Sequence, residues 1–114
     1  MDIEAIRGRL KEFAEARDWE KFHSPKNLAM ALSAEAGELL EVFQWLTEEE
    51  SRNPDQKALA AAKEELADVI IYAIRLADKL GVDVGRAVEE KIAANGKKYP
   101  VDKAKGNAKK YDEF

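Results

Sequence analysis

The sequence predicts an all-α fold, a bundle of four helices. Apolar residues recur at three- and four-residue steps through most of the 114 residues. No segment alternates apolar and polar residues, as a strand would, over more than a few positions. Helix-starting and helix-ending residues separate the periodic segments. A chain of this length is typical of one domain with one core, so we expect a single domain spanning residues 1–114.

The first two helices are predicted from their apolar periodicity and from one clear start signal. The first spans about residues 2–17 and carries Ile3, Ile6, Leu10 and Phe13. Ser24 followed by Pro25 reads as an N-cap with proline at the first helical position, so a second helix starts there. It is expected to run to about Leu46, because the helical period continues to that residue.

The third helix is predicted between a polar segment and a glycine. The segment TEEESRNPDQ contains Asn53-Pro54, a turn signal, and is expected to be a short loop. The helical pattern then runs from about Asp55 to Leu80, and Gly81 is a plausible C-cap. Ile70 and Ile71 are the only strand-like pair, and they lie inside this period.

A fourth helix follows, with Asp83 as its expected N-cap. Val84, Val88 and Ile92 mark its apolar side at four-residue steps. It should end before Tyr99, because the residue preceding Pro100 is pushed away from helical geometry. Residues 101–114 form a polar, lysine-rich tail.

Composition excludes several classes of function. A net charge of −4 argues against a surface for a nucleic-acid polymer, although a free nucleotide is compatible if a metal neutralises its phosphates. The chain has no cysteine, so disulfides, thiolate zinc sites and thiol nucleophiles are absent and any metal must be held by oxygen. There is no apolar run of signal-peptide or membrane-spanning type, so we expect a cytoplasmic protein without a membrane partner.

Two acidic residues of the second helix do not fit its amphipathic pattern. An α-helix turns about 100° per residue, so Glu35 lies within about 20° of Leu28 and Val42, at the centre of the apolar stripe. Glu38 lies one turn from Glu35, and both carboxylates can bind one ion. Glu41, on the outer side, reads as ordinary solvated charge.

The third helix repeats this arrangement. Glu65 and Asp68 are three residues apart and Tyr72 follows, so all three share a face that borders the apolar arc. Two facing pairs of carboxylates would repel each other unless a cation compensates. Mg2+, with Mn2+ as a substitute, suits such an all-oxygen ligand set. The alternative is that these acids lie at the stripe's edges and point into water.

The segments around these acids resemble those of a known family. EAGELLEVFQW and EELADVIIY resemble the E-x-x-E and E-x-x-D signature of the MazG-like all-α nucleotide pyrophosphohydrolases, and in particular their dCTP pyrophosphatase branch. RDWEKFHSPKNL, KIAANGKKYPV and GNAKKYDEF extend the likeness over most of the chain from about Ala16. The resemblance implies an oligomeric helical bundle that hydrolyses a nucleoside triphosphate, dCTP or a modified dCTP, to the monophosphate and pyrophosphate with Mg2+, and so clears unwanted nucleotides.

The resemblance also assigns residues. The metal ligands it implies are Glu35, Glu38, Glu65 and Asp68. The substrate contacts it implies are Trp19, Trp45 and Tyr72 around base and sugar, and Lys91, Asn95 and Tyr99 from the last helix. Leu10 departs from the histidine that animal members of the dCTP branch carry there, which bears on base selectivity.

Several roles stay open on the residues alone. Glu38, toward the edge of the stripe, is our candidate for the base that takes a proton from the attacking water. Trp19 and Trp45 suit either base stacking or core packing. His23, before the Ser24 cap, reads as a hydrogen-bonding loop residue rather than a catalyst.

Two further functional classes compete with the enzyme. One is a non-catalytic metal- or nucleotide-binding bundle, and the other is a helical dimerisation module. A short chain has limited surface to bury alone, so we expect a homodimer or homotetramer.

Overall fold

The computed structural model describes residues 1–114 and contains helices and turns without strands, which confirms the all-α prediction. The chain divides into two compact units, Met1–Val82 and Asp83–Phe114. None of the helices combines the length and apolar content that a membrane crossing requires.

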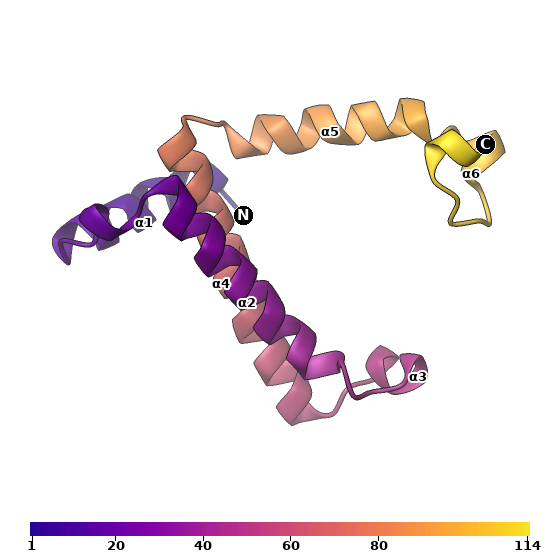
Figure 1. Ribbon diagram of the computed structural model, residues 1–114, viewed down its shortest axis with the longest axis horizontal. Coiled ribbons are helices and arrows are strands. Elements are labelled where there is room, and N and C mark those ends of the chain that lie inside the picture. Colours follow the sequence, from indigo (N-terminus) through magenta and orange to yellow (C-terminus); the bar gives the residue numbers. More distant parts are fainter. The chain divides into compact units, whose positions relative to one another are not determined.

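The first unit is built on an antiparallel pair of long helices (Figure 1). Helix α2 (Pro25–Phe43) packs along α4 (Gln56–Leu80), and α1 (Ile3–Ala16) packs against α4 as well. The short 3-10 helix η1 (Glu20–Phe22) lies in the connection between α1 and α2. The side chains buried in this unit are small apart from two apolar residues and one arginine: Ala14, Leu28, Ala62, Ile74, Ala77 and Arg75.

Local sequence signals fix where α2 and α4 begin. The Ser24 hydroxyl accepts from the Asn27 N–H at 3.1 Å, and the Asp55 carboxylate accepts from the Ala58 N–H at 2.8 Å. Gly81 ends α4 at φ 68°, a left-handed conformation that glycine adopts without a Cβ penalty. The predicted bounds of α1 and α4 agree with the structure to within about one residue.

The polar connection between α2 and α4 is not the plain loop that we predicted. Thr47 and Glu50 form a capping box, with the Glu50 N–H on Thr47 Oγ1 at 3.1 Å and the Thr47 N–H on Glu50 Oε1 at 2.8 Å. This box starts a short helix, α3 (Glu48–Arg52). Helix α2 therefore ends at Phe43 rather than near Leu46, because the chain must turn before Thr47 can cap α3.

The second unit contains α5 (Val84–Lys98), capped by Asp83 and ended by Tyr99, as predicted. The predicted polar tail is more ordered than its composition suggested: it holds α6 (Val101–Ala104) and a 3-10 helix, η2 (Tyr111–Glu113). Tyr99 meets Tyr111 and Phe114 edge to face, with ring centroids 6.2 and 5.8 Å apart. Aromatic packing thus orders a segment rich in lysine.

Candidate active site

Three of the four predicted metal-binding acids form one cluster between α2 and α4. One carboxylate oxygen from each of Glu35, Glu38 and Glu65 lies within 4.8 Å of the others. We call these three residues the acid cluster. The helical spacing that predicted Glu35 beside Glu38 holds, and the antiparallel packing of α4 brings Glu65 to them. Glu38 is exposed, whereas Glu35 and Glu65 are half-buried.

The acid cluster lacks cationic partners. Glu35 Oε2 and Glu65 Oε2 are sealed from solvent and have no hydrogen-bond partner. Buried acceptors without partners are rare in folded proteins and are suited to binding an ion or a water molecule. An oxygen-only set of converging carboxylates fits a hard divalent cation, because such a cation supplies the missing positive charge.

The electrostatics of the cluster agree with this geometry. The pKa of Glu65 is raised to about 7 by the close approach of the Glu35 carboxyl, by burial and by the carboxylate of Glu38. The pKa of Glu35 is raised too: the approach of Glu65 favours its ionised form, but burial and the neighbouring carboxylates of Glu38 and Asp68 outweigh that effect. Without a cation, the cluster therefore resists carrying its full negative charge.

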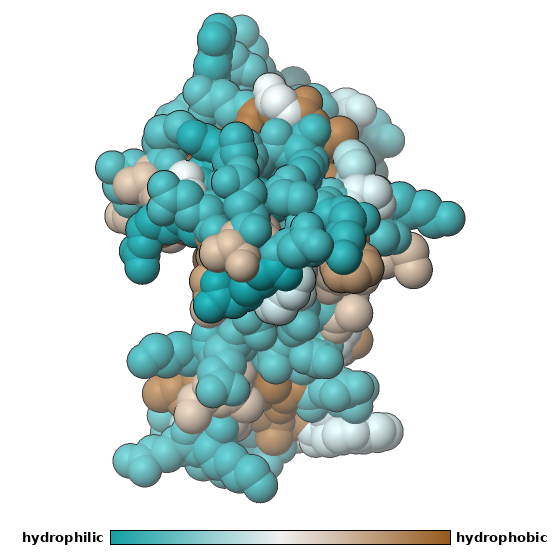
Figure 2. All heavy atoms as spheres, turned by 90° about the vertical axis from the view of Figure 1, so that its left-hand side faces the viewer, coloured by the Kyte–Doolittle hydropathy of each residue, from teal (hydrophilic) through white to brown (hydrophobic).

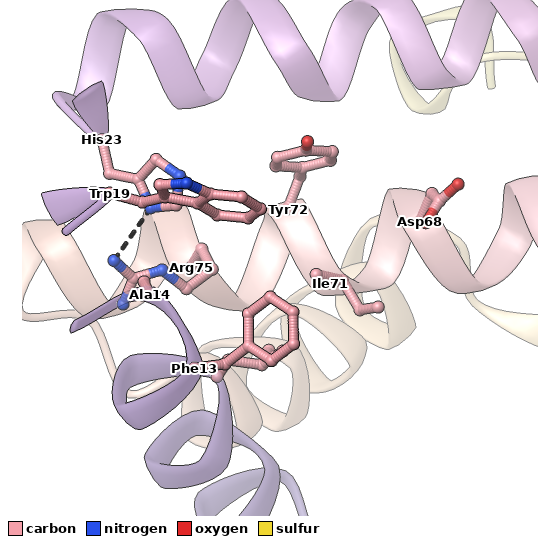
Figure 3. Close-up of a pocket in the computed structure, with 9 residues that line it drawn as sticks. Phe13, Ala14, Trp19, His23, Asp68, Ile71, Tyr72 and Arg75 are labelled. Carbon is pink, nitrogen blue, oxygen red and sulfur yellow. Dashed lines mark hydrogen bonds between the residues drawn. The ribbon is translucent and has the colours of Figure 1, made fainter. Parts of the chain in front are cut away.

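A pocket of about 220 Å3 opens beside the acid cluster in the same unit (Figure 3). Its apolar walls are Leu10, Phe13, Ala14 and Ile71. Its aromatic and polar lining is Trp19, His23, Asp68, Tyr72 and Arg75. Figure 3 places Trp19 and His23 at one end, Asp68 at the other and Tyr72 between them. Asp68, the fourth predicted ligand, thus faces this pocket as well as adding its charge to Glu35.

Two of the predicted substrate contacts, Trp19 and Tyr72, lie in this pocket. Trp19 packs edge to face on Phe13, with ring centroids 5.8 Å apart, yet remains 43% exposed. An indole that is fixed by a neighbouring ring and still partly exposed is suited to stacking on a flat ligand. Leu10 also lines the pocket, so the residue singled out for base selectivity is placed where a ligand can contact it.

The other predicted contacts lie elsewhere. Trp45 follows α2, is 87% exposed and does not line the pocket. Lys91 and Asn95 are exposed residues of α5, and Tyr99 caps that helix within the second unit. Their contact with substrate stays a prediction.

Sequence reasoning missed one polar group of the pocket. Arg75 lies in the C-terminal third of α4 and is only 3% exposed. It pairs with Glu20 at 2.6 Å and with Asp78 at 3.4 Å, and its Nη2 lies 3.1 Å from His23 Nδ1. The sequence did contain a signal of this buried ion pair. An arginine between Ile74 and Leu76 interrupts an apolar pattern, and a buried arginine needs a charged or polar partner.

Comparisons with known proteins identify the family of this chain. A family model described as MazG-like matches residues 30–114. The chain is 46% identical to dCTP pyrophosphatase 1 of Rattus norvegicus and 44% identical to that of Homo sapiens, over 98% of this chain and 67% of each relative. A crystal structure of a pyrophosphatase from Archaeoglobus fulgidus superposes with a TM-score of 0.81 at 39% identity, covering 88% of this chain and 94% of that one. The chain therefore belongs to the MazG-like family, as its motifs predicted.

Proposed function

We propose that this protein is a Mg2+-dependent nucleoside triphosphate pyrophosphohydrolase that converts dCTP, or a modified dCTP, to the monophosphate and pyrophosphate. The prediction of a pyrophosphohydrolase is confirmed at the level of the family by the dCTP pyrophosphatase relatives and the pyrophosphatase structure. The choice of dCTP rests on the names of those relatives, and the choice of Mg2+ on the oxygen-only ligand set.

The observation that carries this proposal is the pair of sealed, unpartnered oxygens in the acid cluster, Glu35 Oε2 and Glu65 Oε2. A helical protein gains nothing in stability from a cluster of carboxylates in which the pKa values of Glu35 and Glu65 are both raised. Their arrangement is explained by a bound cation, which we propose is held by Glu35, Glu38, Glu65 and Asp68. When bound, Mg2+ neutralises phosphate charge and lowers the pKa of water.

Glu38 is the proposed general base. It is the exposed member of the acid cluster, so its carboxylate can accept a proton from a water molecule. That water attacks the α-phosphorus, the bond from the α-phosphorus to the bridging oxygen breaks, and pyrophosphate leaves. Glu35 and Glu65 are more enclosed, which suits them to holding the cation.

The pocket supplies a place for the nucleoside. Asp68 links it to the acids, so a nucleotide with its phosphates at the acid cluster has its base directed toward Trp19 and His23 (Figure 3). We propose that Trp19 stacks on the base and that Tyr72 contacts the sugar. We further propose that Trp45, Lys91, Asn95 and Tyr99 complete the binding of base and phosphates, with the whole chain acting as one domain.

A homodimer or homotetramer is part of the proposal. Many apolar side chains of the long helices are at least 41% exposed in the single chain, among them Met30, Leu40, Leu59, Leu66 and Ile70. Figure 2 shows apolar side chains open at the surface among hydrophilic ones. A second copy would remove this surface from water. We also propose a cytoplasmic location, where nucleoside triphosphates are abundant.

A screen for pyrophosphate release tests the proposal. The chain is incubated with canonical and modified deoxynucleoside triphosphates, with Mg2+ or with a chelator. We expect pyrophosphate from dCTP or a modified dCTP only when Mg2+ is present. Tight nucleotide binding without turnover would overturn the proposal in favour of a non-catalytic binding bundle. The Glu38→Gln variant is expected to bind nucleotide and lose turnover, and full turnover would exclude Glu38 as the base.

A further inference from the structure

Arg75 is held in place at one end of the pocket by three polar groups. Nη2 donates to Glu20 Oε1 at 2.6 Å and to His23 Nδ1 at 3.1 Å, and Nη1 donates to Asp78 Oδ2 at 3.4 Å. Lys79 pairs with the second oxygen of Glu20. Glu20 is the first residue of η1 and His23 follows its last residue, so both lie in the connection that carries Trp19. One buried guanidinium therefore ties this connection to α4.

The contact with Arg75 determines which nitrogen of His23 carries the proton. A guanidinium has donors only and stays charged, so Nδ1 must be the acceptor of the 3.1 Å contact. A neutral imidazole with an unprotonated Nδ1 carries its hydrogen on Nε2. The pKa of His23 is lowered by burial and then by the charges of Arg75 and Lys79, with Glu20 opposing them, so the neutral ring is favoured.

The Nε2–H of His23 is left as a free donor at the pocket. No protein group accepts from it, and Nε2 is not among the unpartnered atoms that are sealed from solvent. His23 lines the pocket beside Trp19, with ring centroids 6.3 Å apart (Figure 3). Arg75, by contrast, is only 3% exposed, and both of its Nη atoms already donate to protein groups, so Arg75 acts on a ligand through His23 rather than by direct contact.

We propose that Arg75 is a positioning residue for base recognition, which fixes His23 as the Nε2–H tautomer and so makes this end of the pocket a donor for the acceptor edge of a cytosine base. This inference rests on the proposed function and deepens it. Cytosine presents acceptors at N3 and O2, whereas thymine and uracil carry a hydrogen on N3. A fixed donor facing N3 therefore favours cytosine. With thymine or uracil, the Nε2–H of His23 would face the N3–H of the base, and neither donor would have an acceptor.

Nitrogen NMR of the imidazole tests the tautomer directly, because His23 is the one histidine of the chain. In the wild-type protein we expect Nδ1 to be unprotonated and Nε2 to carry the hydrogen. In Arg75→Met the two tautomers should mix, and the pKa of His23 should move up toward its ordinary value. Arg7→Gln is the matched control, because Arg7 also pairs with Asp78, at 3.2 Å, but does not line the pocket. A proton on Nδ1 in the wild-type protein would overturn the proposal.

Ligand preference gives the second readout. Affinities for dCMP and dTMP are measured by calorimetry, and kcat and KM for dCTP and dTTP are measured with Mg2+. In Arg75→Met we expect the preference for cytosine to fall by about tenfold, with KM for dCTP raised and kcat nearly unchanged. His23→Phe should lose the same preference, and the double variant should lose little more. Equal losses for cytosine and thymine ligands would mean that Arg75 only supports the fold.

These measurements separate the inference from the proposed function. If the wild-type chain prefers dCMP but releases no pyrophosphate from any nucleotide, the enzyme proposal fails and base recognition stands. If it releases pyrophosphate equally from dCTP and dTTP, the enzyme stands and the role of Arg75 fails. If Arg75→Met does not fold, His23→Phe and the wild-type NMR experiment still decide the outcome.

Discussion

The first unit holds two clusters of charged side chains that are built on opposite principles. The acid cluster brings Glu35, Glu38 and Glu65 within 4.8 Å of one another with no cation, and leaves two oxygens sealed and unpartnered. At the other end of the pocket, Arg75 and Lys79 pair with Glu20. The first cluster raises carboxyl pKa values, whereas the second lowers that of Glu20, chiefly through Lys79.

The difference distinguishes a site that can bind a cation from solution from a set of ion pairs that stabilises the fold. Charges that are mutually satisfied need nothing from solution, and they fix the connection that carries Trp19. Charges of one sign that lie close together in a half-buried position destabilise the folded protein unless a cation binds between them. The contrast between the two clusters, rather than the number of acids, is what points to a metal at Glu35, Glu38 and Glu65.

Removing one carboxylate from the acid cluster should have the largest effect. We expect Glu35→Gln to lower the rate of pyrophosphate release by about 100-fold or more, because a cation held by fewer charges is bound more weakly. The same variant should melt at a higher temperature than the wild type when metal is absent, because like-charge repulsion is relieved. Glu41→Gln, an exposed change on the same helix, is the control and should alter neither quantity. A Glu35→Gln protein with full activity would contradict the metal assignment.

Removing the indole ring of Trp19 from the pocket should have the next largest effect. We expect Trp19→Ala to raise KM for dCTP by about tenfold, since stacking on a base contributes about 1–3 kcal/mol. Phe22→Ala is the matched control, because Phe22 is exposed in the same connection and does not line the pocket. Steady-state kinetics on the three proteins decide the matter. Equal KM values for Trp19→Ala and the wild type would remove the stacking role.

The pH dependence of metal-free stability should reveal the acid cluster. The folded-state pKa of Glu65, about 7, lies above its ordinary value of 4.5. Its stabilising contribution is therefore complete below 4.5 and is lost as the pH rises through 7. We expect the melting temperature in a chelator to fall by a few degrees between pH 6 and pH 8 on thermal scans, and Mg2+ to restore it. Glu65→Gln should show a smaller fall, because the pKa of Glu35 is also raised by burial and by Glu38 and Asp68. A fall of the same size in that variant would exclude Glu65 as its source.

The paired cluster should respond to pH with the opposite sign and more weakly. The pKa of Glu20 lies below its ordinary value of 4.5, so its contribution is present above that value and is lost as the pH falls through the folded-state pKa. We expect Glu20→Gln to melt a few degrees lower than the wild type at pH 7, with the gap closing in acid. Glu12→Gln, an exposed change on α1, should match the wild type. A gap that persists unchanged at low pH would show that the carboxylate charge of Glu20 is not what stabilises the fold.

Much of the fold was predictable because its signals are local. Ser24, Asp55, Gly81 and Asp83 each end or begin a helix by a contact with residues a few positions away, and such contacts can be read in order along the chain. Helix α3 was missed although its capping box, Thr47 and Glu50, is also local. The polar composition of that segment was read as a loop, when the spacing of two residues was the better signal.

The sequence by itself determined the helices and the pairing of acids within each of them, because helical periodicity places residues three apart on one face. Only the tertiary structure decided that Glu65 joins Glu35 and Glu38, while Asp68 also lines the pocket. It likewise decided that Arg75 meets Glu20, 55 residues earlier in the chain. Contacts between helices depend on how each helix is rotated and packed against its neighbour, and the period of either helix alone does not contain that information.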